Sequence, residues 1–302
     1  MSAYHTPVLL EESITALDIR EDGVYVDATF GGGGHSREIL SRLGPKGRLI
    51  AFDRDEEALA NAPRDGRLTL VHGDFRFVHN FVKYHGCTSV DGILADLGVS
   101  SHQFDTAERG FSFRFDEAPL DMRMNPHAQI CAADILNSYS GEDLERIFRL
   151  YGEVEGSRRL AELIVASRGR SPLKTTQDLG RAIAPALPKF MEHKYLAKIY
   201  QALRIEVNGE MTSLEGFMKG ALRSLGQGAR LAVITYHSLE DRIVKNAIRE
   251  GCRQKLLERV SRKPVLPSEE EISSNTRARS AKLRVAGKVG TFEHERKDQR
   301  HR

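Results

Sequence analysis

The sequence has few cysteines and no long apolar run, and each shortage excludes a class of protein. The three cysteines, Cys87, Cys131 and Cys252, lie far apart without a C-x-x-C pair, so we expect reduced thiols and no disulfide framework. No stretch approaches the roughly 18 apolar residues that a membrane-spanning helix needs, and no secretory signal is recognisable. No His, Cys and carboxylate ligands are grouped, so no metal is expected. We expect a cytoplasmic protein without a membrane anchor.

Net charge is also small, but its distribution is uneven. The 302 residues carry a formal charge of +3. Residues 242–302 hold 17 Lys and Arg against 8 Asp and Glu, whereas the preceding 241 residues hold 28 against 34. A basic C-terminal segment is typical of proteins that meet a polyanion, and RNA or DNA is the obvious choice. A solvated basic tail is the alternative.

What the sequence does contain is a block of four glycines after a short β-branched run. Asp27 lies near the end of the run, the glycines occupy 31–34, and a helical pattern follows. Glycines at a strand-to-helix turn let the backbone approach a ligand, and the first N–H groups of the helix are unpaired. A second apolar run ends in Asp53, where nucleotide-binding sheets place the acid that holds a ribose. Together these features predict a cofactor that contains a nucleoside.

The acid before the glycines helps to distinguish the cofactors. The dinucleotide fingerprint G-x-G-x-x-G binds a pyrophosphate, whereas these glycines are uninterrupted and follow Asp27. A carboxylate repels a pyrophosphate and attracts the ammonium and sulfonium groups of S-adenosylmethionine. The residues therefore favour S-adenosylmethionine over NAD, and an NAD-dependent oxidoreductase stays as an alternative.

Strand and helix patterns alternate along the early chain and again near its end, which predicts an α/β fold with a parallel sheet covered on both faces. Strand patterns occupy 24–28, 49–52, 68–71, 92–95, 230–235 and 282–286. From about 130 to 205 only helical patterns occur. We therefore expect a discontinuous cofactor-binding domain, residues 1–105 and 206–302, interrupted by a helical substrate-recognition domain over 106–205. Residues 264–278, rich in Pro, Ser and Glu, predict a flexible loop.

Asp96, at the end of the fourth strand pattern, is the candidate catalytic residue. Small residues such as Gly98 and Ser100 follow it and would let a substrate approach. An exocyclic amine conjugated to a ring is a poor nucleophile, so an acid that accepts its N–H would assist attack on a methyl group. A simple capping role for Asp96 is the alternative.

Three further segments carry charge but leave their roles open. His237 beside Ser238 invites a hydrolase interpretation, but G-x-S-x-G is absent, and we expect Ser238 to cap a helix with Asp241 in its first turn. The loop around Arg109 is either a lid that stacks on a base or a packed hinge. The alternating basic residues of 277–282 are either phosphate contacts or a solvated edge.

Taken together, the motifs closely resemble one family, the bacterial 16S ribosomal RNA cytosine-N4 methyltransferases, also called RsmH or MraW. The matching segments are HTPVLLEE at 5–12, VDATFGGGGHS at 26–36, FDRD at 52–55, DGILADLGVSSHQFD at 91–105, AERGFSFRFDEAPLDMRMN at 107–125, QALRIEVNGE at 201–210, ITYHSLEDRIVK at 234–245 and TRARSAKLR at 276–284. The resemblance spans essentially the full chain, and the run over 91–125 is its most specific part.

The resemblance implies a Rossmann-like class I S-adenosylmethionine-dependent methyltransferase sheet with an inserted all-helical domain. It implies methylation of the exocyclic N4 amine of a cytosine in the decoding region of 16S rRNA, in the small ribosomal subunit. Matched motif by motif, the cofactor contacts would be Gly33, Gly34, His35, Asp53, Phe75, Asp96 and Gln103. A non-catalytic RNA-binding ribosome assembly factor is a further alternative. The oligomeric state is open, with a homodimer as one option.

Overall fold

The computed structural model describes residues 7–290, and contacts along the chain divide them into two compact units. The first unit comprises 7–53, 58–98 and 214–290, and the second comprises 54–57 and 99–213. The end of the basic C-terminal segment and the first two residues of the HTPVLLEE motif lie outside the described residues. No helix among residues 7–290 has the length and apolar character that crossing a membrane requires.

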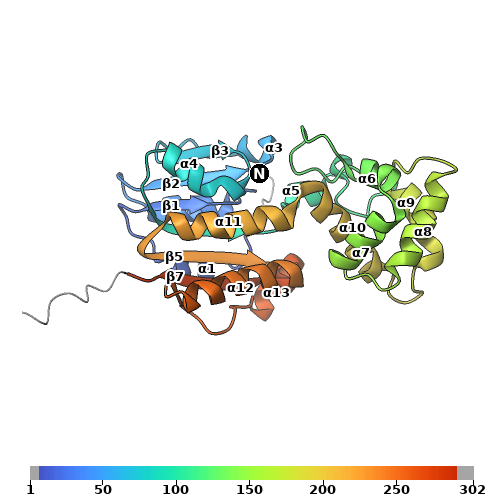
Figure 1. Ribbon diagram of the computed structural model, residues 1–302. Helices are drawn as coiled ribbons and strands as arrows, with labels where there is room; N and C mark the ends of the chain where they lie inside the picture. Colours follow the sequence, from blue (N-terminus) through green and yellow to red (C-terminus); the bar gives the residue numbers. More distant parts are fainter. Residues whose placement is uncertain (1–6, 291–302) are drawn as a thin grey trace, which may run out of the picture. The chain divides into compact units, whose positions relative to one another are not determined.

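The first unit is built on a seven-stranded sheet in the order β3-β2-β1-β4-β5-β7-β6 (Figure 1). Its strands are β1 (Val24–Asp27), β2 (Arg48–Asp53), β3 (Leu68–His72), β4 (Val90–Asp96), β5 (Leu225–Thr235), β6 (Leu257–Arg259) and β7 (Lys282–Lys288). Strands β1 to β5 pair in parallel, whereas β7 runs antiparallel to both β5 and β6. The predicted α/β fold class is confirmed, and all six predicted strand patterns are strands. Asp27, Asp53 and Asp96 are the last residues of three neighbouring strands, so they lie together at the carboxyl ends of the sheet.

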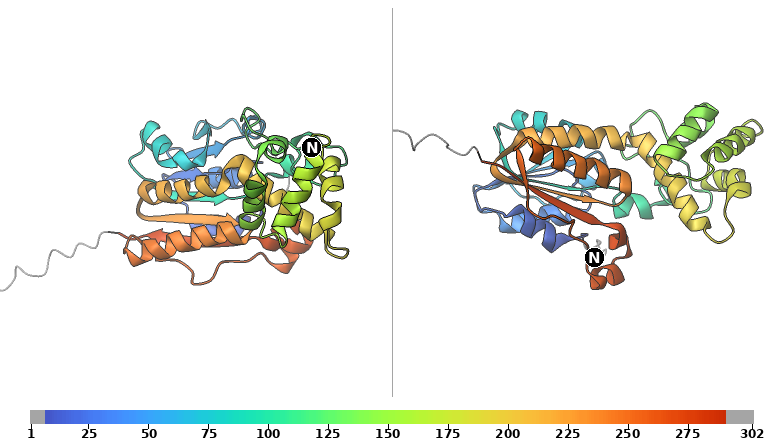
Figure 2. Two further views of the ribbon diagram at one scale, coloured as in Figure 1. Left: turned by 45° about the vertical axis from the view of Figure 1, so that its right-hand side comes forward. Right: turned by 60° about the horizontal axis from the view of Figure 1, so that its bottom comes forward.

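Helices cover both faces of this sheet, as Figure 2 shows. They are α1 (Leu10–Leu17), α2 (Gly34–Arg42), α4 (Val78–Tyr84), α11 (Glu210–Ser224) and α12 (Ser238–Arg253). The exposed helix α13 (Glu269–Ser274) precedes β7, and the division between the units falls within α3 (Glu56–Leu59). Successive strand residues alternate between the faces: Leu49 packs in a core with α1 and α2, and Ile50 in a core with α4, α11 and α12. Strands buried on both sides explain the continuous apolar runs in the sequence.

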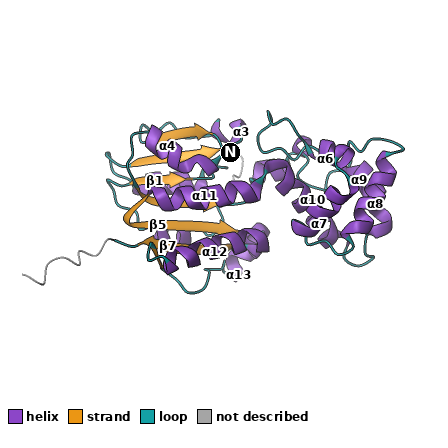
Figure 3. Ribbon diagram, viewed as in Figure 1, coloured by secondary structure: helices purple, strands orange, loops and turns teal. Residues whose placement is uncertain are grey.

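The second unit, residues 54–57 and 99–213, is helical. Its helices are α5 (Ser101–Asp105), α6 (Ala132–Ser138), α7 (Gly141–Leu150), α8 (Ser157–Arg168), α9 (Thr176–Ile183) and α10 (Glu192–Asn208) (Figure 3). The periodic residues of α7, Leu144, Ile147 and Phe148, are buried in a core shared with α6, α8, α9 and α10. Ser140 begins α7 by accepting a hydrogen bond from the Asp143 N–H at 3.0 Å.

The predicted flexible loop over 264–278 is wrong, because the segment contains α13 and a 3₁₀ turn at Thr276–Ser280. Ser268 caps α13 by accepting a hydrogen bond from the Glu271 N–H at 3.1 Å, and three glutamates lie in the first turn. Glu271 also accepts a hydrogen bond from the Leu9 N–H at 2.7 Å. The serine followed three residues later by a glutamate is a helix-start signal that outweighed the loop-like composition.

Candidate active site

The glycine turn is held against the carboxyl end of β2. The Gly31 N–H donates to Asp53 Oδ2 at 2.8 Å, and the Phe30 N–H donates to the Phe52 carbonyl at 2.7 Å. Gly33 has φ +73° and begins α2, and a Cβ there would lie 2.7 Å from the Phe30 ring. A Cβ on Gly34 would lie 2.1 Å from Pro7 Cγ. Both positions need glycine, one for its backbone conformation and both for close packing.

Asp27, the acid before the glycines, is fully buried at the end of β1. It accepts a hydrogen bond from the Ser36 hydroxyl at 2.6 Å and another from the Thr29 N–H at 3.1 Å. Burial raises the pKa of Asp27 to about 7, although these hydrogen bonds oppose the rise. Among the described residues, neither Lys nor Arg pairs with this carboxyl group. A buried carboxyl group without a cation is a site where a positively charged ligand is stabilised.

Asp96, at the end of β4, is fixed by three contacts within the first unit. Its Oδ1 accepts a hydrogen bond from the Tyr236 hydroxyl at 2.7 Å, and its N–H donates to the Thr29 hydroxyl at 2.7 Å. Its Oδ2 lies 3.8 Å from His35 Nδ1, and 22% of the side chain is exposed. Burial raises the pKa of Asp96 to about 7, and the Tyr236 hydrogen bond opposes that rise. The carboxyl group is thus oriented, partly accessible and poised to titrate near neutral pH.

His35 lies in the first turn of α2 and is neutral at physiological pH. Its Nε2 lies 3.2 Å from the Val8 carbonyl, and burial lowers the pKa of His35 to about 4. Because a carbonyl only accepts, Nε2 carries the proton and Nδ1 presents a lone pair toward Asp96. Tyr236 stays protonated, since burial and then the charge of Asp96 raise its pKa well above 10. His35 therefore brings no positive charge to Asp96.

The residues that follow β5 form a structural cap. The N-cap of α12 is His237, not Ser238 as predicted. Its Nδ1 accepts a hydrogen bond from the Glu240 backbone N–H, with 3.5 Å between the two nitrogens. Buried Glu240 reaches back and accepts a hydrogen bond from the Tyr236 N–H at 2.8 Å. This reciprocal arrangement fixes the backbone of Tyr236 and therefore its hydroxyl beside Asp96. Asp241 lies in the first turn of α12, as predicted.

The remaining predicted cofactor contacts lie in two places. Phe75 follows β3 in the first unit and packs edge-on against Phe217, with ring centroids 5.2 Å apart. Gln103 belongs to the second unit, where it is buried and completes the capping box of α5 with Ser100. Its Nε2 donates to Asp55 Oδ2 at 2.8 Å.

Asp55 and Arg109 form a buried ion pair in the second unit. Arg109 Nη1 lies 2.7 Å from Asp55 Oδ2, and Arg109 Nη2 donates to the carbonyls of Arg123 and Met124 at 3.0 and 3.1 Å. The Arg109 side chain is only 10% exposed and that of Asp55 only 2%. The Arg109 side chain is therefore packed within the second unit, and the choice between a lid and a packed hinge stays a prediction.

Sequence reasoning missed two site residues, Thr29 and Tyr236. Thr29 lies inside the glycine motif, and its side chain holds the Asp96 backbone across two strands. Tyr236 follows β5 and is separated from Asp96 by 140 residues. The only signal in the sequence was a polar aromatic residue directly after a strand pattern. Its proximity to Asp96 comes from the pairing of β4 with β5, which the sequence does not reveal.

Comparisons with known proteins agree with this arrangement. The model of the MraW methylase family matches residues 2–289. Ribosomal RNA small subunit methyltransferase H of Parabacteroides distasonis is 52% identical over 301 residues, which is 95% of this chain and 98% of that protein. The proteins of the same name from Flavobacterium johnsoniae and Bacteroides fragilis are also 52% identical, over 297 and 299 residues, with 95% of this chain and 98% of each relative covered.

A family match over nearly the whole chain, supported by relatives of this identity, also confirms the predicted enzyme class of methyltransferase. The chain belongs to the MraW methylase family.

Proposed function

We propose that this protein transfers a methyl group from S-adenosylmethionine to the exocyclic N4 amine of a cytosine in the decoding region of 16S rRNA. The observation that carries the proposal is a pair of carboxyl groups at adjoining strand ends, Asp27 fully buried and Asp96 partly exposed, in a chain of a methylase family. Relatives that are 52% identical are named for the small-subunit ribosomal RNA, which supports the choice of substrate.

The residues at the strand ends fit the methyl donor. S-adenosylmethionine, when bound, supplies a methyl group activated by a positively charged sulfur. Asp27 and Asp96 favour that positive charge, because both carboxyl groups are held near neutral pKa by burial without a neighbouring Lys or Arg among the described residues. The first N–H groups of α2, at Gly34 and His35, suit a carboxylate of the same ligand. The proposed cofactor contacts are Gly33, Gly34, His35, Asp53, Phe75, Asp96 and Gln103.

Asp96 is the proposed catalytic residue, and its role is to orient the target amine. Its ionised carboxylate accepts an N–H of the amine and stabilises the positive charge that develops on nitrogen during attack. Tyr236 occupies Oδ1 at 2.7 Å, so Oδ2 is the oxygen that is less constrained. No dedicated general base is needed, because the amine loses its proton after the methyl group is transferred.

The inserted helical domain over 106–205 is proposed to recognise the RNA, together with the basic C-terminal segment. The target cytosine must be unstacked or already unpaired to reach Asp96. The cytoplasmic localisation follows from this substrate and stays a prediction, as does any homodimer.

The alternatives lack support. An NAD-dependent oxidoreductase does not agree with membership in a methylase family, and Asp27 would repel a pyrophosphate. A non-catalytic assembly factor likewise does not agree with membership in a methylase family.

The test is methyl transfer in vitro to small ribosomal subunits that lack the modification, followed by nucleoside analysis. We expect N4-methylcytidine with the wild type and at least about a hundredfold slower transfer with Asp96→Ala, since electrostatic contacts made in the transition state contribute on this scale. Asp22→Asn, in the exposed turn before β1, is the control and should match the wild type. Methyl groups found only on DNA, protein or another RNA position would refute the proposal.

A further inference from the structure

A small cavity in the first unit is lined mainly by cationic side chains. Its volume is about 50 Å³, and it lies where α12, β6, β7 and the loop after β6 meet. The lining residues are Lys245, Ile248, Arg259, Ser261, Arg262, Lys263, Arg284 and Val285. Five of these eight are cationic and none is acidic. One water needs roughly 10–15 Å³ on the same measure, so the cavity has room for several oxygen atoms.

One of the five cations is fixed in place. Arg284, on β7, binds both carboxylate oxygens of Asp241 on α12, at 2.6 and 3.0 Å. Burial acts to raise the pKa of Asp241, but the hydrogen bond and charge of Arg284 prevail and lower it, so this pair stays ionised. The pair holds the wall of the cavity rigid, and its two charges cancel.

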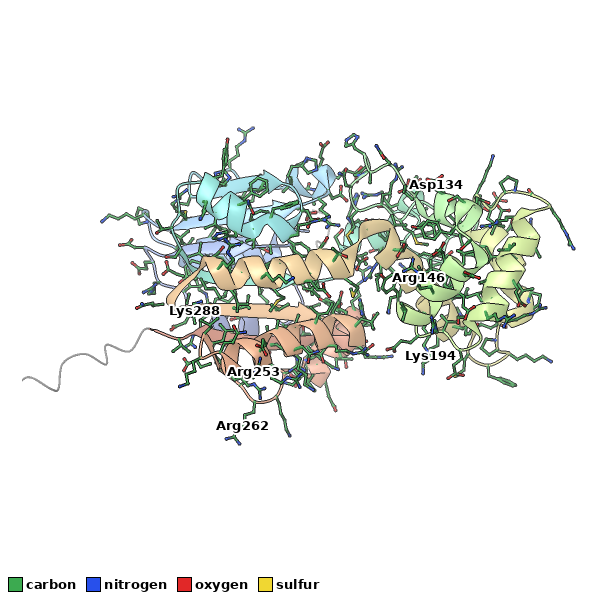
Figure 4. The ribbon with its side chains drawn as sticks, in the orientation of Figure 1. Asp134, Arg146, Lys194, Arg253, Arg262 and Lys288 are labelled. Atoms are coloured by element: carbon green, nitrogen blue, oxygen red, sulfur yellow. The ribbon has the colours of Figure 1, made fainter. Side chains whose placement is uncertain are left out.

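In the part of the chain that the structure describes, the other four cations form no direct ion pair of this kind, although the charge of Lys245 also acts on Asp241. Lys245, Arg259, Arg262 and Lys263 are exposed, and within residues 7–290 none of them forms an ion pair with a carboxylate. Figure 4 shows Arg262 at the margin of the unit with its side chain directed away from the ribbon. Four like charges around one cavity repel one another, and an anion between them removes that repulsion.

We propose that this cavity binds a backbone phosphate of the rRNA substrate. Arg and Lys are the side chains that hold phosphate oxygens, and a mostly exposed cationic cavity suits a charged, hydrated group. The inference rests on the proposed function and adds a place where the substrate is held. The sequence pointed to the basic residues of 277–282 as phosphate contacts, whereas this inference assigns phosphate binding to other residues.

The sheet places this cavity near the proposed reaction centre. Asp96 pairs with Ile234, and Ile234 pairs with Leu283, so the three lie in one row across β4, β5 and β7. Two strand spacings separate Asp96 from Leu283, or roughly 10 Å, and Arg284 is the next residue along β7. At about 3.4 Å per stacked nucleotide, this distance corresponds to roughly three nucleotides. The cavity begins at Arg284, one residue further from the carboxyl end of β5, so the bound phosphate is expected at least about three nucleotides from the target cytosine.

The test compares two double variants of equal charge change. Arg262→Gln with Lys263→Gln removes two cations from the cavity. Lys46→Gln with Arg64→Gln removes two exposed cations before β2 and β3, at the opposite edge of the same sheet. Affinity for 16S rRNA is measured between 50 and 300 mM salt, with S-adenosylmethionine affinity and thermal stability measured in parallel.

We expect the cavity variant to lower the slope of log affinity against log salt by about 0.7, the value for the single phosphate that the protein no longer neutralises. At 0.1 M salt this corresponds to roughly fivefold weaker RNA binding. The reduction should be equal for RNAs of different sequence, since phosphates carry no sequence information, and cofactor affinity should not change.

Other results overturn the inference in distinguishable ways. Equal slopes and affinities for the two double variants would make the cavity a solvated edge and leave the proposed function standing. A reduction confined to one RNA sequence would indicate base recognition and refute the phosphate assignment. Wild-type protein that neither binds nor methylates 16S rRNA would overturn the proposed function and this inference with it.

Discussion

Replacing Tyr236 by phenylalanine should shift the pH dependence of methyl transfer. The change removes only the hydroxyl that donates to Asp96 Oδ1 at 2.7 Å. Glu240 continues to hold the Tyr236 backbone at 2.8 Å, so the ring of the variant should stay in place. The perturbation therefore acts on the ionisation of Asp96 more than on packing.

The size of the shift follows from the strength of that hydrogen bond. A hydrogen bond to a charged group contributes about 1.5–3 kcal/mol, and one pKa unit corresponds to about 1.4 kcal/mol. The Tyr236 hydroxyl lowers the pKa of Asp96, which stands at about 7. Its removal should therefore raise the pKa of Asp96 by roughly one to two units. Because the ionised carboxylate accepts the amine N–H, the acid limb of the rate profile should move to higher pH by the same amount.

The assay is kcat/KM for methyl transfer between pH 6 and 9.5. Tyr139→Phe serves as a matched control, because the Tyr139 hydroxyl donates to the Glu206 carboxylate at 2.9 Å in the other unit. We expect the control to keep the wild-type profile. If Tyr236→Phe lowered the rate equally at every pH, or left the profile unchanged, the assigned coupling between Tyr236 and Asp96 would be refuted.

Three further substitutions test separate parts of the account. Asp27→Asn should increase the free energy of unfolding above pH 7 but not at pH 4, as measured by urea unfolding. Burial raises the pKa of Asp27 to about 7, so the wild type loses stability as pH rises from 4 to 7, whereas the variant does not. A difference between the two proteins that is the same at every pH would contradict this. Gly33→Ala should cost about 1–2 kcal/mol and weaken cofactor binding, since φ is +73° and the Cβ meets the Phe30 ring; unchanged calorimetric affinity would count against the glycine turn as the cofactor site. Arg109→Met should destabilise by about 3–5 kcal/mol in thermal unfolding, because the buried Asp55 carboxylate loses the charge of the Arg109 guanidinium, and a change below about 1 kcal/mol would contradict the importance of this ion pair.

Much of the fold was predictable because burial leaves a strong signal in a parallel sheet. Strands buried on both faces, such as 49–52 and 230–235, are continuous apolar runs and were identified. Strand β6 was missed, because Leu257–Arg259 is short and only Leu257 is buried. A strand of this kind forms only because β7 offers it a free edge, which is a property of the assembled sheet.

The site was predictable to the extent that it depends on strand ends. The acids Asp27, Asp53 and Asp96 follow directly from the apolar runs that precede them. Their ionisation does not, because it depends on burial and on partners far away in the chain, such as Tyr236 for Asp96. The cap at His237 shows the same limit at short range, since its acceptor role became clear only from the Glu240 N–H contact.

Titration calorimetry of S-adenosylmethionine binding as a function of pH tests the central claim most directly. Binding a cation beside Asp27 and Asp96 requires them to ionise, so protons should be released and affinity should rise between pH 6 and 8 by about tenfold for each group that ionises. S-adenosylhomocysteine, whose sulfur is uncharged, should show a weaker dependence. Failure to bind the donor, or an affinity that is constant over this range, would contradict the account.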